Sequence, residues 1–179
     1  MEEFKKLITS KTKIIAVTHL SNVTGTIVPI KEIVSLAKAK NIPVLVDGCQ
    51  SAPHIKIDVK DLDCDFYAIS CHKVYGPTGV GILYAKKKWL EKLPPYIGGG
   101  AMISEVKKDK ITYAPLPEKY EAGTMPTAEV ITFNESIKFM KSIGMENLVN
   151  HEKEITNYAL DKLQRINSSN NFSSSNVVK

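Results

Sequence analysis

Short apolar runs alternate with segments of mixed polarity through the first half of the chain. The runs at residues 13–18 (KIIAVT), 42–46 and 66–69 have the length and composition that are typical of buried strands. Between the first two runs, Pro29 begins a segment whose apolar residues recur at helical spacing: Ile30, Ile33, Val34 and Ala37. This order of strand, helix and strand predicts an α/β fold with parallel strands and right-handed crossovers.

The pattern changes after residue 80. Residues 80–85 form another apolar run after a glycine-rich turn, and we expect this strand to run back against its neighbours. A short helix is predicted at residues 86–93. Residues 97–120 have no clear period and several glycines and prolines, so we expect a long functional loop that holds one short hairpin.

Two amphipathic helices are predicted next. We expect Thr127 to cap the first and Gly144 to end it, with an apolar face made of Val130, Phe133, Ile137 and Met140. The second spans residues 146–166, with an apolar face made of Leu148, Ile155, Ala159, Leu163 and Ile166. From Asn167 onward the composition turns to Asn and Ser, which predicts a disordered tail over residues 167–179.

Polar residues follow two of the predicted parallel strands. Asp47 comes directly after the run at 42–46, and Lys73 follows the run at 66–69. Ligands of open α/β sheets bind outside the carboxyl ends of the strands, so we expect the carboxylate and the amine to face one crevice. Each residue alone has a plainer interpretation, because lysines are usually solvated and an Asp after a strand often caps the next helix.

An acid and an amine at one crevice suit a ligand with a ring nitrogen at one end and a carbonyl at the other. Pyridoxal phosphate is held in this way, by a lysine Schiff base and an aspartate on its pyridinium nitrogen. Partial burial and a nearby cation would lower the pKa of the Lys73 amine and so let it attack an aldehyde. Ser70 and His72 alternate on one side of an extended segment, from which both can reach one anion.

Composition narrows the possible classes of protein. The chain has 179 residues, of which 43% are hydrophobic, and this is enough for one domain with a real core. The net charge is +5, but the lysines are scattered apart from Lys86–Lys88, so we expect no nucleic-acid partner. Three cysteines without paired metal-ligand spacing predict a reducing compartment and no metal site. No apolar run reaches the length of a membrane span, so we expect no membrane partner.

Several motifs carry a resemblance to a known family. They are VDGCQS at residues 46–51, LDCDFY at 62–67, SCHKVYGPTG at 70–79, GGGAMI at 98–103 and YEAGT at 120–124. Together they resemble the class V aminotransferase family of pyridoxal phosphate enzymes, and within it the SufS-like cysteine desulfurases. The resemblance covers about residues 11–166 and is most specific around Asp47 and Lys73.

The resemblance implies a fold and a set of roles. The fold would be part of the large domain of the aspartate aminotransferase-like (fold type I) superfamily, a mostly parallel sheet flanked by helices, with residues 1–166 as an incomplete cofactor-binding domain. The implied cofactor-binding residues are Lys73, Asp47, Gln50, Ser70, His72, Asn22 and Thr124. Gln50 would bind the ring hydroxyl, Asn22 would lie beside cofactor and substrate, and Thr124 would reach the phosphate of a neighbouring subunit, which implies a homodimer. His19 is a weaker candidate.

The implied reaction converts L-cysteine to L-alanine and passes the sulfur, as a persulfide, to an acceptor protein for iron–sulfur cluster assembly in the SUF system. The sequence departs from this family at the substrate-binding arginine and the sulfur-accepting cysteine, because Arg165 is poorly placed and Cys71 is expected to pack. We therefore expect an incomplete and inactive enzyme, from the cytoplasm or a plastid-type organelle. A selenocysteine lyase, an aminotransferase or a non-catalytic interaction fragment remain alternatives.

Overall fold

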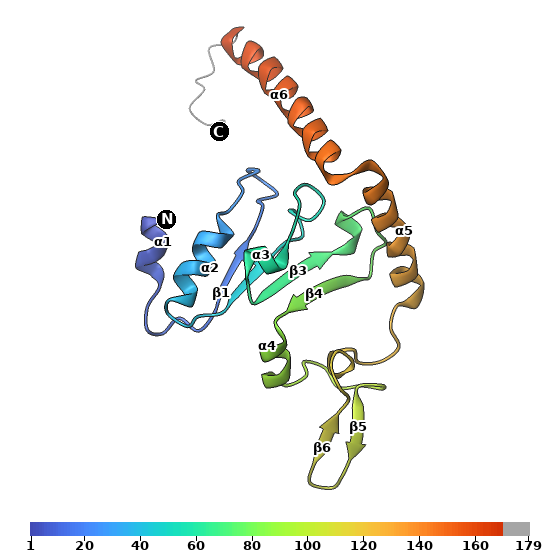
Figure 1. The fold of residues 1–179 in the computed structure, drawn as a ribbon. Helices are drawn as coiled ribbons and strands as arrows, with labels where there is room; N and C mark the ends of the chain where they lie inside the picture. The colour runs from blue at the N-terminus through green and yellow to red at the C-terminus, as the bar shows by residue number, and fades with distance from the viewer. Residues whose placement is uncertain (170–179) are drawn as a thin grey trace.

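A four-stranded sheet forms the centre of the computed structural model, which describes residues 1–169 (Figure 1). Its strands are β1 (Ile15–Thr18), β2 (Val44–Asp47), β3 (Phe66–Ser70) and β4 (Gly81–Ala85), in that order across the sheet. The first three are parallel, and β4 runs antiparallel to β3. The predicted α/β class, the parallel strands and the return strand are confirmed.

Helices and short turns precede, connect and follow these strands. They are α1 (Glu2–Leu7), α2 (Ile30–Lys38), α3 (Val59–Leu62), η1 (Cys71–Lys73), α4 (Lys87–Lys92), η2 (Glu118–Tyr120), α5 (Thr127–Ile143) and α6 (Met145–Ser169). All four apolar residues predicted for the face of α2 are buried, and they share one core with Val44, Val46 and Tyr67 of the sheet. The apolar residues that recur at helical spacing are therefore those that α2 buries against the parallel strands.

A second, smaller core fixes α5 against the turn after β3. Cys71 and Val74 pack there against Phe133 and Met140 of the helix. A Cβ at Gly76 would lie 2.5 Å from the Phe133 ring, so the contact between turn and helix requires glycine. The packing role predicted for Cys71 is confirmed, because its side chain is fully buried.

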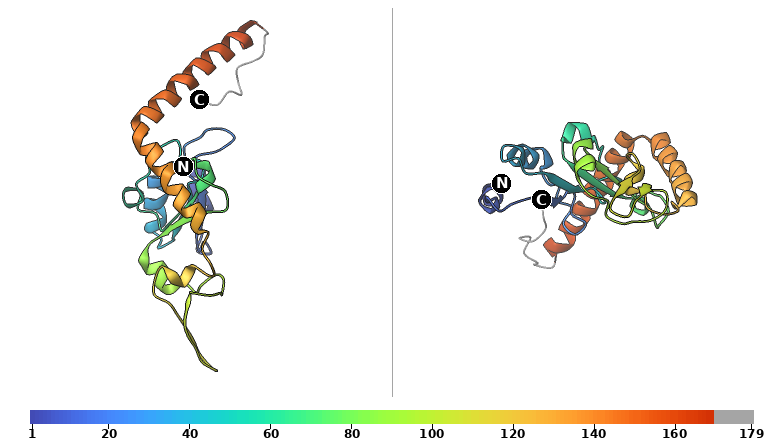
Figure 2. Two further views of the ribbon diagram at one scale, coloured as in Figure 1. Left: turned by 90° about the vertical axis from the view of Figure 1, so that its right-hand side faces the viewer. Right: turned by 90° about the horizontal axis from the view of Figure 1, so that it is seen from below.

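The two long helices differ in detail from the prediction. Thr127 does not cap α5, since it is the first helical residue and Pro126 occupies the cap position without a side-chain hydrogen bond. Gly144 ends α5 with a φ of 83°, as predicted. The predicted apolar face of α5 is buried in part, because Phe133 and Met140 pack in the second core whereas Val130 is 46% accessible and Ile137 36%. Of the face predicted for α6, only Leu148 is buried. Figure 2 shows α6 extending away from the body of the molecule. The tail was predicted to be disordered from residue 167, but residues 167–169 are the last turn of α6, and residues 170–179 lie outside the described residues.

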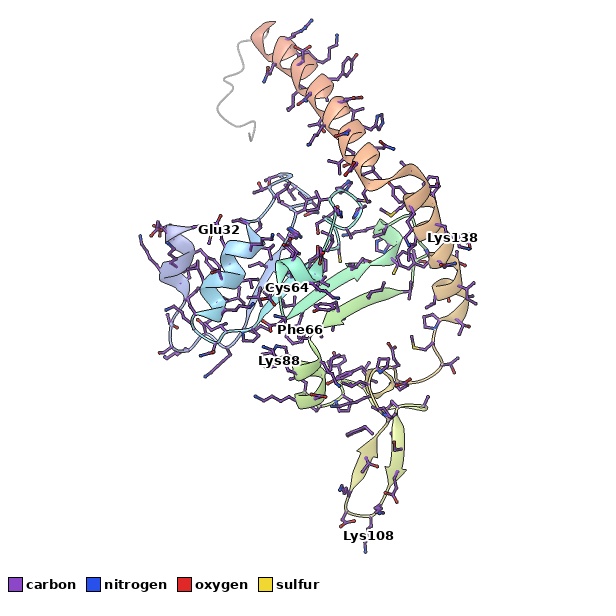
Figure 3. The ribbon with its side chains drawn as sticks, in the orientation of Figure 1. Glu32, Cys64, Phe66, Lys88, Lys108 and Lys138 are labelled. Carbon is purple, nitrogen blue, oxygen red and sulfur yellow. The ribbon has the colours of Figure 1, made fainter. Side chains whose placement is uncertain are left out.

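The long segment between α4 and α5 holds the predicted hairpin. It consists of β5 (Ile103–Val106) and β6 (Ile111–Tyr113), which pair antiparallel and project from the body (Figures 1 and 2). Side chains drawn in Figure 3 show Cys64 and Phe66 directed into the body, whereas Lys108 at the hairpin tip points into solvent. Among the helices of residues 1–169, none has the length and apolar character that crossing a membrane requires.

Candidate functional site

The carboxyl ends of β2 and β3 bring the predicted acid and amine to one edge of the sheet. Asp47 is the last residue of β2 and is paired with Ala68 of the parallel strand β3. Lys73 ends η1, the turn that begins directly after β3. Both side chains are exposed, so a ligand can reach the carboxylate and the amine from the same side.

Cys49 follows Asp47 by two residues, and its thiol is influenced by both Asp47 and Lys73. Its backbone N–H donates a hydrogen bond of 2.9 Å to Oδ1 of Asp47, which fixes the carboxylate in a tight turn. Burial and a hydrogen bond to the Asp47 carboxylate raise the pKa of the Cys49 thiol, while the Ser70 backbone amide and the Lys73 ammonium act in the opposite direction. One thiol is thus under the influence of Asp47, Ser70 and Lys73 together. Nothing in the sequence singles out Cys49 beyond its place two residues after Asp47.

Ser70 and His72 form a pair, although the local geometry is not the extended segment that was predicted. Ser70 ends β3, and His72 lies in the 3₁₀ turn η1, yet Ser70 Oγ and His72 Nδ1 are 2.9 Å apart. The turn directs Cys71 into the core and leaves His72 and Lys73 accessible. A hydroxyl and an imidazole are therefore available together to bind an anion beside the amine.

The remaining predicted residues lie at two different places. Gln50 is half-buried in the turn after β2, and Asn22 is exposed in the loop that follows β1, so both belong to the carboxyl edge of the sheet. Thr124 lies in another part of the chain, in the segment between η2 and α5 (Figure 1). It follows η2, whose Tyr120 hydroxyl donates to the carbonyl oxygens of Leu90 and Leu93 (both 2.8 Å) and so binds that segment to α4.

A buried polar group lies beneath the Asp47 turn, and sequence reasoning missed most of it. The Tyr67 hydroxyl is 2.7 Å from Ser51 Oγ and 2.9 Å from His19 Nδ1, and all three side chains are buried. Burial raises the pKa of Tyr67 to about 12 and lowers the pKa of His19. The one hint in the sequence was the glycine at position 48. In the structure a Cβ there would lie 2.0 Å from Tyr67 Cε1, so the position requires glycine.

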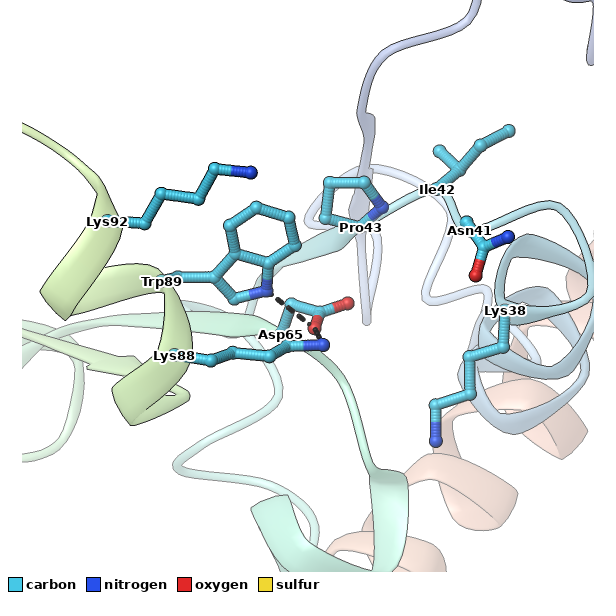
Figure 4. A pocket seen from close by; sticks show the side chains of 8 residues that line it. All are labelled: Lys38, Asn41, Ile42, Pro43, Asp65, Lys88, Trp89 and Lys92. Carbon is cyan, nitrogen blue, oxygen red and sulfur yellow. Dashed lines mark hydrogen bonds and ion pairs between the residues drawn. The ribbon is translucent and has the colours of Figure 1, made fainter.

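A hollow of about 320 Å³ lies at the opposite edge of the sheet and is shown in Figure 4. Asp65 at its base accepts hydrogen bonds from Trp89 Nε1 (2.7 Å) and the Val44 backbone N–H (3.1 Å), with Lys88 Nζ at 3.3 Å. Burial opposes ionisation of Asp65, but these donors outweigh it and hold the pKa of the carboxyl below its usual range. Asp65 thus attaches α4 to the sheet, a structural task.

The groups at the carboxyl edge fit one kind of ligand by their chemistry. Lys73 offers an accessible amine, Asp47 an accessible carboxylate, and Ser70 with His72 a hydrogen-bonding pair. These match an aldehyde, a protonated ring nitrogen and an anionic group on the same small molecule. The donor set therefore fits pyridoxal phosphate.

Comparisons with known proteins point the same way. The sequence model of the family described as "Aminotransferase class-V" matches residues 1–177. A "Probable cysteine desulfurase" from Halalkalibacterium halodurans is 48% identical over 93% of the chain, and a "Cysteine desulfurase" from Cronobacter sakazakii is 44% identical over the same share. The crystal structure of the Escherichia coli cysteine desulfurase CsdA superposes with a TM-score of 0.87 at 37% identity, over 91% of this chain. The chain spans about 41% of the length of each of these relatives.

Proposed function

Because the chain belongs to the class-V aminotransferase family, we propose that it is the cofactor-holding part of a pyridoxal-phosphate-dependent cysteine desulfurase. The relatives named cysteine desulfurases support this activity. The observation that carries the proposal is the position of Asp47 and Lys73 at one edge of the sheet, Asp47 at the end of β2 and Lys73 in the turn directly after the adjacent parallel strand β3. A solved relative, a variant of C-DES with glycine covalently linked to its PLP cofactor, supports the choice of cofactor (TM-score 0.74, 27% identity).

Each residue of the site has a defined task in this proposal. Pyridoxal phosphate, when bound, supplies an aldehyde and an electron-withdrawing ring. The Lys73 amine would hold the aldehyde carbon covalently, and the Asp47 carboxylate would keep the proton on the ring nitrogen. Ser70 and His72 would bind the phosphate. Gln50 would hydrogen-bond the ring hydroxyl, and Asn22 would lie beside cofactor and substrate.

The proposed reaction of the whole enzyme releases L-alanine from L-cysteine and passes the sulfur as a persulfide to an acceptor protein. We place it with the SufS-like enzymes, in iron–sulfur cluster assembly by the SUF system, on the motifs around residues 98–103 and 120–124. Thr124 would complete the phosphate site of a second subunit, so the working enzyme would be a homodimer. In an enzyme extended to the length of the relatives, equilibrium dialysis against pyridoxal phosphate would show whether Thr124→Ala lowers cofactor affinity, and sedimentation would show whether the enzyme is a dimer.

Within residues 1–169, two tasks of this reaction lack a suitable side chain: binding the substrate carboxylate and accepting the sulfur atom. Arg165 makes two contacts with Asp161, of 2.9 and 3.2 Å, on the exposed helix α6, and so is engaged away from the site. Cys64 and Cys71 are fully buried and Cys49 is half-buried, and burial raises the pKa of all three thiols, which disfavours the reactive thiolate. We therefore propose that this chain alone binds the cofactor weakly and does not turn over L-cysteine.

The decisive experiment labels the proposed lysine. The chain is mixed with pyridoxal phosphate, reduced with borohydride, digested and analysed by mass spectrometry. We expect the cofactor adduct on the peptide that contains Lys73, and its loss in Lys73→Ala but not in the matched control Lys87→Ala, which removes an exposed lysine of α4. An adduct of equal yield in the Lys73 variant would refute the assignment, and alanine production from L-cysteine by the pure chain would refute the proposed inactivity.

A further inference from the structure

The buried polar group beneath the site closes a ring around one peptide bond. Tyr67 bridges His19 and Ser51 through its hydroxyl, at 2.9 and 2.7 Å. Ser51 Oγ in turn donates to the Gly48 carbonyl oxygen at 3.1 Å, and the His19 backbone N–H donates to the Asp47 carbonyl oxygen at 2.9 Å. The ring of hydrogen bonds therefore passes through the Asp47–Gly48 peptide. It joins the segments that follow β1 and β2 to Tyr67 of β3.

The direction of the protons in this ring can be worked out from its fixed acceptor. A carbonyl oxygen only accepts, so the single Ser51 hydroxyl proton points to Gly48. Ser51 must then accept from the Tyr67 hydroxyl, and Tyr67 in turn must accept from His19 Nδ1–H. The reverse direction would leave the oxygens of Ser51 and Gly48 facing each other at 3.1 Å with no proton between them, which is unfavourable in a buried site.

The ionisation of the ring members agrees with this direction. Burial lowers the pKa of His19, so at neutral pH the imidazole is neutral and carries one ring proton. Burial also raises the pKa of Tyr67, so its hydroxyl keeps the proton that it donates to Ser51. A neutral imidazole with its proton on Nδ1 has an unprotonated Nε2.

We propose that His19, Ser51 and Tyr67 are positioning residues, which hold the Asp47–Gly48 peptide, and with it the Asp47 carboxylate, in place for the cofactor ring through an Nδ1-protonated, neutral His19. The proposal deepens the proposed function and rests on it where the cofactor is concerned. The tautomer of His19 does not depend on any ligand, so that part of the proposal stands or falls separately.

Nitrogen NMR of the free chain tests the tautomer directly. The four histidines of the chain are labelled with ¹⁵N, and His19 is assigned from the signals that disappear in His19→Gln. At neutral pH we expect a protonated Nδ1 and an unprotonated Nε2 for His19, and a redistribution of the proton in Tyr67→Phe, which removes the acceptor. A wild-type His19 protonated on Nε2, or a tautomer unchanged by Tyr67→Phe, would overturn the proposal.

Cofactor affinity tests the positioning role. Equilibrium dialysis against pyridoxal phosphate compares the wild type with Tyr67→Phe and Ser51→Ala, and Tyr84→Phe is the control. Tyr84 is paired with Tyr67 across β3 and β4 and lies outside the ring of hydrogen bonds. We expect a loss of about tenfold in affinity in each test variant, the size of one net buried hydrogen bond, and none in the control.

The outcomes of the two measurements are distinguishable. Test variants that keep the circular-dichroism spectrum and bind like the wild type would overturn the positioning role while leaving the proposed function intact. A wild type that binds no pyridoxal phosphate would overturn both the proposed function and the positioning role, and the NMR result would still decide the tautomer. Should Tyr67→Phe not fold, Ser51→Ala provides the same comparison, because it breaks the ring at a smaller side chain.

Discussion

Gly48 lies against the phenol ring of Tyr67 so closely that no side chain fits between them. A Cβ at position 48 would be 2.0 Å from Tyr67 Cε1 and 2.6 Å from the hydroxyl oxygen. Tyr67 cannot withdraw, because it is fully buried and hydrogen-bonded to Ser51 and His19. The residue next to Asp47 must therefore be glycine, and the turn that carries the carboxylate rests directly on the sheet.

This contact predicts the effect of Gly48→Ala. The added methyl group would force the Tyr67 ring or the turn to move, and overpacking of this kind lowers the free energy of unfolding by about 1–3 kcal/mol. Urea denaturation followed by the fluorescence of Trp89, the single tryptophan of the chain, measures the change. Gly98→Ala is the control, since nothing lies within 4 Å of its Cβ position. Equal stabilities of the two variants would contradict the contact.

Asp65→Ala should destabilise the fold more strongly. The substitution removes the acceptor of the Trp89 and Val44 N–H groups and the carboxylate that faces Lys88, while Lys86 keeps its ion pair with Asp63. Loss of one member of a buried ion pair costs about 3–5 kcal/mol, and because Lys88 is largely exposed we expect the lower end of that range. Thermal and urea unfolding followed by circular dichroism measure it.

Asp61→Ala is the matched control for Asp65→Ala. It breaks an exposed ion pair with Lys31, and such pairs contribute about 0–1 kcal/mol. If the two aspartate variants unfolded at the same urea concentration, the structural role of Asp65 would be refuted.

Burial of His19 predicts how stability depends on pH. Its pKa in the folded chain is lower than the ordinary value of 6.5, so the unfolded chain takes up the proton first as the pH falls. This contribution to stability is complete above pH 6.5 and is lost as the pH falls through 6.5 toward the lower folded pKa. We expect the midpoint temperature of thermal unfolding to decrease as the pH is lowered from 7.5 to 5.5. His19→Gln should make this dependence on pH weaker. The control His151→Gln, at an exposed position of α6, should keep the wild-type slope.

Removal of the Ser70–His72 pair should weaken cofactor binding. Hydrogen bonds to a charged group contribute about 1.5–3 kcal/mol, so Ser70→Ala and His72→Gln are each expected to lower the affinity for pyridoxal phosphate by about tenfold or more. The effect should be much smaller for pyridoxal without its phosphate, and dialysis with both ligands measures the difference. Thr78→Ala, at an exposed position of the turn after η1, is the control and should bind both ligands like the wild type. Equal losses for the two ligands would show that the pair does not bind the phosphate.

The sequence predicted those features that burial alone determines. Parallel strands, the helix beginning after Pro29 and the return strand followed from apolar runs and helical spacing, and each is present. The common edge of Asp47 and Lys73 followed from the same pattern, because parallel strands end on the same side. Once the parallel strands are predicted, the location of a site formed at their carboxyl ends can be predicted as well.

Other features depend on contacts that no local pattern contains. His19 and Tyr67 are 48 positions apart, and a tyrosine within a strand looks like any other apolar residue. The cap predicted at Thr127 failed because Pro126, with its restricted φ of −72°, takes the cap position. The apolar stripe of α6 was predicted correctly as a pattern, but a stripe does not identify what covers it.

The outer strands of the sheet have a practical consequence. Within residues 1–169, β1 and β4 each pair with one neighbour only, and β4 carries the exposed side chains of Ile82 and Leu83. A row of unsatisfied backbone N–H and C=O groups beside apolar side chains is a template for adding strands from other molecules. At high concentration, molecules of this chain should therefore pair through these outer strands and form insoluble aggregates, unless another strand covers the free edges of β1 and β4.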